Sequence, residues 1–125
     1  MSDEARIEVL RRLVEAFNRQ DVDAAVTLFA DDGVWEASRG PEIWGRRFSG
    51  SAELREAMTE RFRALPDGRY TEDTHVVFDD RGFSEWTFTA TTPEGTEMKV
   101  RGGDIWTFEE DLIARKNSFW KIVEQ

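Results

Sequence analysis

The chain has 125 residues, of which 39% are apolar, and includes five Trp and nine Phe, so we expect one domain with one core over residues 1–125. The absence of Cys excludes disulfides and thiolate chemistry, and the single His leaves only a carboxylate-rich metal site, so we expect no metal and no cofactor. The net charge of −9 opposes binding to nucleic acid, and the lack of a long apolar run or a secretory leader predicts a soluble, cytoplasmic protein without membrane contact.

Helical spacing of apolar side chains predicts three amphipathic helices in the first half of the chain. The first covers residues 3–19, and Ser2 or Asp3 can cap its start. The second is shorter, begins at Val22 and ends near Asp31. The third covers residues 52–65, with Ser51 as its cap, and Pro66–Asp67–Gly68 ends it.

The remaining segments have the pattern of strands. A short strand is expected at residues 34–37, and a loop rich in Gly, Pro and Arg follows at residues 38–50. After the third helix the apolar period changes to two, which predicts four further strands at residues 70–78, 82–91, 96–108 and 113–123. Helices followed by an antiparallel meander indicate an α+β domain.

One face of the last two strands combines an acid with aromatic rings. Asp104, Trp106 and Phe108 alternate on one strand, and Ser118 and Trp120 alternate on the next. Burial among rings favours the neutral form of a carboxyl group, so Asp104 can act as a hydrogen-bond donor or a general acid. The alternative is a structural ion pair of Asp104 with Arg101, Lys116 or Arg47. Gly102 and Gly103 are expected to bend the strand just before the acid.

His75, the only imidazole, shares the parity of Thr71, Asp73 and Val77. That parity places it either in a pocket as a general acid or base, or at the surface as a solvated strand residue. Trp35 on the first strand and Trp44 in the loop are expected to border the mouth of a pocket. Either tryptophan can pack in the core, and we favour ligand contact for Trp44.

Several blocks along the chain resemble the SnoaL-like branch of the nuclear transport factor 2-like superfamily, which also includes ketosteroid isomerases and limonene epoxide hydrolase. The matching blocks are Ala16–Asp21, Thr27–Trp35, Gly45–Gly50, Gly103–Phe108 and Ser118–Trp120. The resemblance implies a cone, in which three helices pack on a strongly curved sheet around an internal pocket, and commonly a homodimer through the outer sheet face. The inward residues would then include Trp86 and Phe88 with Trp106, Phe108, Ser118 and Trp120.

The resemblance transfers only part of a known site. Asp104 falls where ketosteroid isomerases carry the aspartic acid of their oxyanion hole, but the isomerase tyrosine position is Leu13 and the base position is Ala37. The epoxide hydrolase aspartate position is Ser118. Two functions remain open. One is acid–base chemistry of the isomerase, cyclase or dehydratase type on a cyclic apolar substrate through Asp104 and His75, and the other is non-catalytic binding of a hydrophobic cyclic metabolite.

Overall fold

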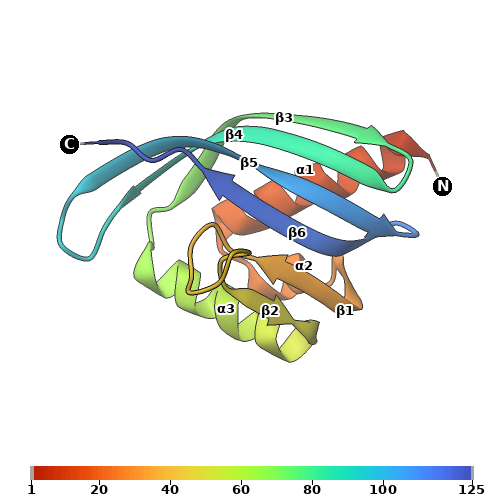
Figure 1. Cartoon of the computed structure of the whole chain (residues 1–125), viewed down its shortest axis with the longest axis horizontal. Coiled ribbons are helices and arrows are strands. Elements are labelled where there is room, and N and C mark those ends of the chain that lie inside the picture. Colours follow the sequence, from red (N-terminus) through yellow and green to blue (C-terminus); the bar gives the residue numbers. More distant parts are fainter. Residues whose placement is uncertain (1, 125) are drawn as a thin grey trace.

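A computed structural model describes residues 2–124 as three helices packed against one curved sheet (Figure 1). The helices are α1 (Asp3–Arg19), α2 (Val22–Val26) and α3 (Gly50–Ala64). The strands are β1 (Phe29–Glu36), β2 (Arg47–Ser49), β3 (Arg69–Phe78), β4 (Arg81–Thr91), β5 (Glu97–Glu109) and β6 (Leu112–Trp120). They form one sheet in the order β2-β1-β6-β5-β4-β3, and this arrangement confirms the expected α+β class.

The direction of one strand differs from the expected antiparallel sheet. β1 lies parallel to β6, whereas every other pair of neighbouring strands is antiparallel. Alternating burial predicts which side chains share a face, but it says nothing about strand direction. The connection from β1 to β6 contains most of the chain, so it is long enough for a parallel pair.

The boundary between the second helix and the first strand lies earlier than the sequence predicts. α2 ends at Val26, and Phe29 already belongs to β1, whose pairing with β6 shifts register between Phe29 and Val34. A short apolar run fits both periods, so it cannot separate a helix end from a strand start. The expected loop over residues 38–50 also contains the short edge strand β2.

The start of α1 agrees with its capping signal, because the Ser2 hydroxyl accepts a hydrogen bond from the Ala5 amide at 3.1 Å. At α3 the predicted cap is wrong by two residues. Ser49 takes the N-cap position, and its amide donates to the Glu53 carboxylate at 2.8 Å.

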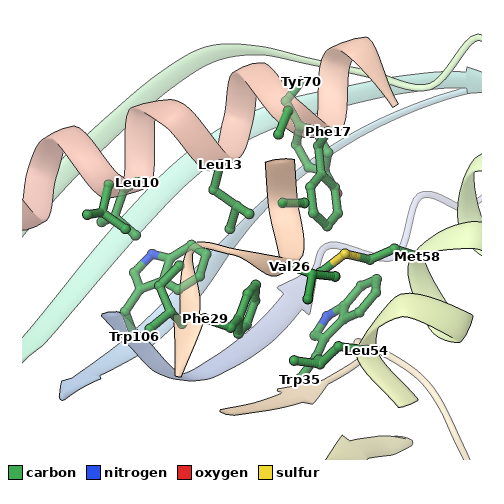
Figure 2. Close-up of a cluster of buried hydrophobic side chains, with 14 of the residues drawn as sticks. Leu10, Leu13, Phe17, Val26, Phe29, Trp35, Leu54, Met58, Tyr70 and Trp106 are labelled. Atoms are coloured by element: carbon green, nitrogen blue, oxygen red, sulfur yellow. The ribbon is translucent and has the colours of Figure 1, made fainter. Parts of the chain in front are cut away.

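The core lies between the helices and the concave face of the sheet (Figure 2). α1 packs along β3 and α3 packs on β1. Gly102 allows one close approach in the sheet, because a Cβ atom there would lie 2.6 Å from the Trp86 ring and 2.5 Å from the Phe119 carbonyl oxygen. The glycine expected to bend β5 therefore also makes room for an indole on the inner face.

Candidate functional site

A small cavity of about 20 Å³ lies between α1 and the inner face of the sheet. It is far smaller than the roughly 300–1,000 Å³ that is typical of ligand pockets, so a ring-sized ligand can enter only if the lining side chains move. Residues of α1 and of strands β3 to β6 line it: Leu13, Val14, Phe17, Tyr70, His75, Ser84, Trp86, Asp104, Trp106 and Lys116. The cavity therefore lies inside the cone, where the family resemblance predicts a pocket, and its walls are mostly aromatic or aliphatic.

A row of polar side chains crosses four strands at the cavity. His75 pairs with Ser84, Ser84 pairs with Asp104, and Asp104 pairs with Ser118, so these four residues are cross-strand neighbours on β3, β4, β5 and β6. Residues directly opposite one another in a sheet point to the same face. The two residues predicted to be catalytic, His75 and Asp104, are thus separated by one serine.

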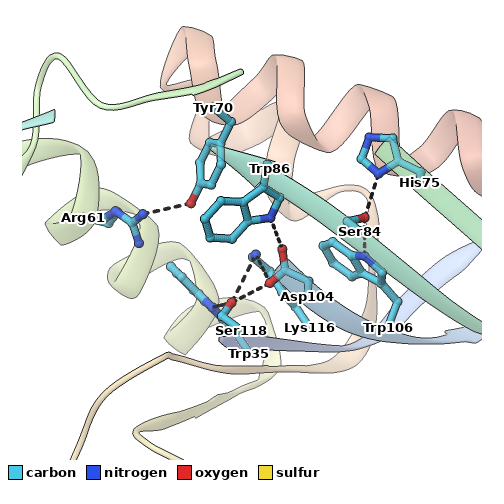
Figure 3. Close-up of polar contacts among 10 residues, drawn as sticks. All are labelled: Trp35, Arg61, Tyr70, His75, Ser84, Trp86, Asp104, Trp106, Lys116 and Ser118. Atoms are coloured by element: carbon cyan, nitrogen blue, oxygen red, sulfur yellow. Dashed lines mark hydrogen bonds and ion pairs between the residues drawn. The ribbon is translucent and has the colours of Figure 1, made fainter. Parts of the chain in front are cut away.

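Asp104 accepts hydrogen bonds from three donors and has no acceptor partner (Figure 3). Oδ1 accepts from Lys116 Nζ at 2.7 Å and from Ser118 Oγ at 2.6 Å, and Oδ2 accepts from Trp86 Nε1 at 2.8 Å. Such partners suit an ionised carboxylate, which only accepts, and they leave no role for a proton on Asp104. The expected neutral acid is therefore not what the geometry favours. The structure instead contains the alternative ion pair, with Lys116 as the partner, while Arg101 and Arg47 bind other carboxylates.

Three buried indoles donate to three members of the polar row. Trp106 Nε1 donates to Ser84 Oγ at 2.7 Å, Trp86 Nε1 donates to Asp104, and Trp35 Nε1 donates to Ser118 Oγ at 3.2 Å. An indole N–H can only donate. The oxygen atoms of the row therefore act as acceptors toward the aromatic walls, and each indole is held in a fixed orientation.

Lys116 brings a positive charge into the aromatic cavity. Its side chain is 4% exposed, and Nζ lies 5.0 Å from the Trp106 ring centroid and 5.6 Å from those of Phe17 and Trp35. These distances are within the range of cation–π attraction. Nζ also donates to Asp104 and, at 3.3 Å, to Ser118. The ammonium is thus compensated by one carboxylate and three ring faces.

His75 lies in the cavity wall and makes a hydrogen bond through each ring nitrogen. Nδ1 is 2.6 Å from Ser84 Oγ, and Nε2 is 2.8 Å from Asp73 Oδ2. The imidazole is 4% exposed and the Asp73 side chain is 30% exposed. Of the two placements that the sequence allows for His75, the structure has the inward one.

A bulge in β3 determines which of its side chains face inward. The pairing of β3 with β4 shifts register between Thr71 and Thr74, and Glu72 has a φ of 54°. Tyr70 and His75 have opposite sequence parity, yet both line the cavity. The bulge is what makes this possible, because an extra residue inverts the alternation of faces. Side chains in residues 71–77 therefore do not alternate strictly between the two faces of the sheet.

The other expected aromatic residues are buried, or partly buried in the case of Trp120, and lie at different distances from the cavity. Trp86 and Trp106 line it, and Trp35 contacts its polar row. Phe88 and Trp120 lie beyond Tyr70, with ring centroids 5.3 Å apart, and the Arg61 guanidinium lies over both rings. The Arg6 guanidinium lies 5.6 Å from the Phe108 ring centroid, and Phe108 is not among the residues that line the cavity.

Trp44 does not lie where it was expected. It is exposed, and its ring centroid lies 4.3 Å from the Arg47 guanidinium, which in turn donates to the Glu36 carboxylate. Glu36 follows Trp35 in β1 and therefore points to the sheet face opposite the cavity, where it is buried beneath Arg47 and Arg115. Stacking on Arg47, which is itself paired with Glu36, thus holds Trp44 on the outer face.

Sequence reasoning missed Tyr70 and Ser84 as cavity residues and treated Lys116 only as a possible partner of Asp104. Ser84 has the parity of Trp86 and Phe88, so the same alternation that identified the aromatic face also contained this signal. Tyr70 had no such signal, because the bulge separates it from His75. Within residues 2–124, no group of three or more His, Asp or Glu side chains could hold a metal ion, and no helix is long and apolar enough to cross a membrane.

Comparison with known proteins gives one family and many structural neighbours. A family model for the SnoaL-like domain matches residues 10–116. A search of curated proteins finds no match to this sequence.

Three solved structures illustrate the structural likeness. A candidate polyketide cyclase from Xanthomonas campestris has a TM-score of 0.83 at 20% identity, with 95% of this chain and 92% of that chain covered. TerC co-crystallised with polyporic acid has a TM-score of 0.79 at 19% identity, covering 94% and 92%. A protein with a ketosteroid isomerase-like fold from Catenulispora acidiphila, in complex with trimethylamine, has a TM-score of 0.82 at 15% identity, covering 92% and 86%. At these identities the likeness establishes the cone fold alone.

Proposed function

Because the chain belongs to the SnoaL-like family, we propose that its cavity binds a small, largely apolar cyclic molecule and catalyses a proton transfer of the isomerase, cyclase or dehydratase type. The observation that carries this proposal is the buried imidazole of His75 in the cavity wall, hydrogen-bonded to Ser84 at 2.6 Å. A fold hosts many reactions, so the chemistry rests on the site alone. The neighbours named after a polyketide cyclase and crystallised with polyporic acid support a cyclic, oxygen-bearing ligand.

In this proposal His75 is the general base and acts through Ser84. Both imidazole nitrogens are already hydrogen-bonded, so a substrate proton passes to Ser84 Oγ while the serine proton passes to His75 Nδ1. Asp73 fixes the imidazole by accepting from Nε2. This relay replaces direct contact between the imidazole and the substrate, and it requires only small shifts of two protons.

Lys116 stabilises the negative oxygen that forms when a proton leaves carbon. Its ammonium group has three donors, of which two are engaged by Asp104 and Ser118, so one remains for a ligand oxygen. Asp104 then positions Lys116 rather than serving as the acid itself. A fixed donor beside a developing enolate is a large source of catalysis in a site that excludes water.

The test is solvent deuterium incorporation at C4 and C6 of 2-cyclohexen-1-one, the carbons whose deprotonation gives an enolate, followed by proton NMR in D₂O. We expect His75→Gln to lower the enzymatic exchange rate by about 100-fold or more, because glutamine keeps a polar contact but cannot take the proton. Lys121→Met changes an exposed lysine and serves as the control. Equal exchange by the wild type and His75→Gln would refute the proton-transfer proposal.

A second candidate function is non-catalytic binding in the same cavity. It is favoured by the complete pairing of Asp104 with donors, which is typical of a structural ion pair. The neighbour in complex with trimethylamine is consistent with simple binding in this fold. Saturable calorimetric binding of cyclic ketones, together with no exchange above the uncatalysed rate, would favour this function over catalysis.

We also infer a homodimer through the outer sheet face. Val76, Phe78, Phe83 and Phe119 are each more than half exposed, and Val76 and Phe83 are cross-strand partners on β3 and β4. An exposed apolar group of this kind is typical of an interface. Sedimentation equilibrium at micromolar concentration should give a dimer for the wild type and a monomer for Phe83→Lys. A wild-type monomer would contradict the inference.

A further inference from the structure

We propose that Ser84, His75 and Asp73 form a nucleophilic relay that transfers the acyl group of a small ester through a covalent intermediate on Ser84. The proposal uses the cavity of the proposed function but does not depend on proton transfer from carbon. The hydrogen bonds are short enough for such a relay, at 2.6 Å from Ser84 Oγ to His75 Nδ1 and 2.8 Å from His75 Nε2 to Asp73 Oδ2.

For a neutral imidazole, donor and acceptor counting places the protons of the relay. The Asp73 carboxylate can only accept, so in the neutral imidazole His75 Nε2 carries the ring proton and Nδ1 has a free lone pair. Trp106 Nε1 donates to Ser84 Oγ at 2.7 Å and occupies one of its two lone pairs. The Ser84 hydroxyl proton therefore points to His75 Nδ1, and one lone pair on Oγ remains for attack on a carbonyl carbon.

Ser118, the other hydroxyl in the polar row, differs on each of these points. Trp35 Nε1 and Lys116 Nζ both donate to its oxygen, which fills both lone pairs. Its proton is donated to Asp104 at 2.6 Å, and Asp104 is held by its ion pair with Lys116. Of the two serines in the row, only Ser84 has an imidazole base and a free lone pair.

The backbone of β3 is shaped around this relay. Glu72 lies in the left-handed region at a φ of 54°, which costs conformational energy for a residue other than glycine. Its carboxylate accepts from the Thr87 hydroxyl at 2.8 Å and so stabilises the bulge. The bulge directly precedes Asp73 and brings His75 to the inner face. Strained backbone is common at functional sites, and here it lies next to the relay.

The reaction follows from these positions. Ser84 Oγ forms a bond to the ester carbonyl carbon as its proton moves to His75 Nδ1, giving a tetrahedral oxyanion. Lys116 provides a positive charge in the same cavity for that oxyanion. The bond to the leaving alcohol then breaks, and His75 returns the proton to the leaving oxygen. Water attacks the Ser84 ester by the same steps in reverse order, releases the carboxylic acid and restores the hydroxyl.

The cavity limits the substrate class. The cavity of about 20 Å³ must widen to admit an ester, and its walls of Trp86, Trp106 and Phe17 favour a substrate with a single aromatic ring and a short acyl group. Small aryl esters, such as acetates of phenols, match the aromatic walls and require the least widening. The ring would lie against the aromatic walls, and the acyl carbon would lie at the polar row.

The experiment uses p-nitrophenyl acetate with an acid quench, intact mass and peptide mapping. We expect a burst of one p-nitrophenolate per chain and one acetyl group on Ser84. Ser84→Ala should abolish both, and the exposed Ser51→Ala variant should keep both. An acetyl group found only on lysine side chains or on Ser118 would overturn the proposal.

Asp73→Asn tests the relay without changing the nucleophile, and its half-exposed position makes loss of folding less of a concern than at Ser84. The asparagine amide can donate to Nε2, which fixes the other tautomer and removes the acceptor for the Ser84 proton. We expect the acylation rate constant to fall at least about 100-fold while the half-saturating ester concentration stays unchanged. Unchanged acylation in this variant would overturn the relay.

The outcomes also separate this proposal from the proton-transfer function. Acetylation of Ser84 without deuterium exchange into 2-cyclohexen-1-one would support the relay and refute the proton-transfer proposal. Deuterium exchange without acetylation of Ser84 would support the proton-transfer proposal and refute the nucleophilic relay.

Discussion

Replacing Lys116 with methionine removes the ammonium group beside Asp104 and keeps a side chain of similar length. The carboxylate would remain in a site where its side chain is 2% exposed, with only the neutral donors of Trp86 and Ser118. A buried charge that loses its partner is costly because nothing replaces the lost attraction or the lost hydration. We therefore expect Lys116→Met to be strongly destabilising.

The size of the effect follows from the geometry of the pair. At 2.7 Å between Lys116 Nζ and Asp104 Oδ1, two unit charges attract by about 6 kcal/mol at an effective dielectric constant of ~20. Desolvation of the two ions offsets much of this attraction, so the intact pair contributes little compared with apolar side chains. Breaking it from one side nevertheless costs about 3–5 kcal/mol of unfolding free energy.

A double-mutant cycle with Asp104→Asn separates the charge pair from packing. In the Lys116→Met, Asp104→Asn protein no unpaired charge remains, and the asparagine oxygen still accepts one hydrogen bond. We expect its unfolding free energy to lie within about 2 kcal/mol of the wild type, well above that of Lys116→Met alone.

Urea denaturation followed by circular dichroism measures the unfolding free energy of the wild type, the two single variants and the double variant. Lys121→Met, which changes an exposed lysine in the same way, should alter the unfolding free energy by no more than about 0.5 kcal/mol. If the effects of the two single substitutions simply add in the double variant, Asp104 and Lys116 do not interact as argued, and the reasoning fails.

Two further predictions concern the sheet and its edges. Gly102→Ala would place a Cβ atom 2.5 Å from the Phe119 carbonyl oxygen and 2.6 Å from the Trp86 ring, so thermal denaturation should reveal a loss of about 1–3 kcal/mol or more; unchanged stability would show that the sheet relaxes there. Hydrogen bonds from the Thr91 amide and hydroxyl lower the pKa of Asp67 below its usual 3.8. The ionised Asp67 therefore adds to the unfolding free energy at a pH above its unfolded-state pKa, and this contribution is lost as the pH falls through its folded-state pKa. Asp67→Asn should therefore be less stable than the wild type at pH 7, with the difference shrinking below pH 3.8 in urea titrations, and a difference independent of pH would contradict this assignment.

Much of the fold could be predicted from the sequence because its elements have clear periodicity and end signals. The helix over residues 3–19 has both a cap and an apolar stripe, and the structure has the same bounds. The direction of β1 had no such signal, since its parallel partner β6 lies far away in the sequence, with Val34 opposite Arg115, and leaves no local pattern. The start of β1 at Phe29 was hidden by an apolar run that fits a helix equally well.

The candidate site was predictable where alternation holds and not where it is interrupted. The inward positions of Asp104 and Trp106 follow from strict alternation in β5. The bulge at Glu72 breaks alternation in β3, so the joint inward placement of Tyr70 and His75 could not be derived from spacing. The identity of the cation that pairs with Asp104 depends on how far side chains reach across neighbouring strands. The sequence offers a few candidate cations but does not choose among them.

The three indoles that donate to Ser84, Asp104 and Ser118 make the protein an optical reporter of its own pocket. Indole emission depends on the polarity and hydrogen bonding around the ring nitrogen, so a ligand that displaces one of these bonds changes the emission of a chromophore already in place. Trp44, which lies on the outer face, provides a signal that such a ligand should leave unchanged. Occupancy of the pocket can therefore be followed without a label, before any reaction is known.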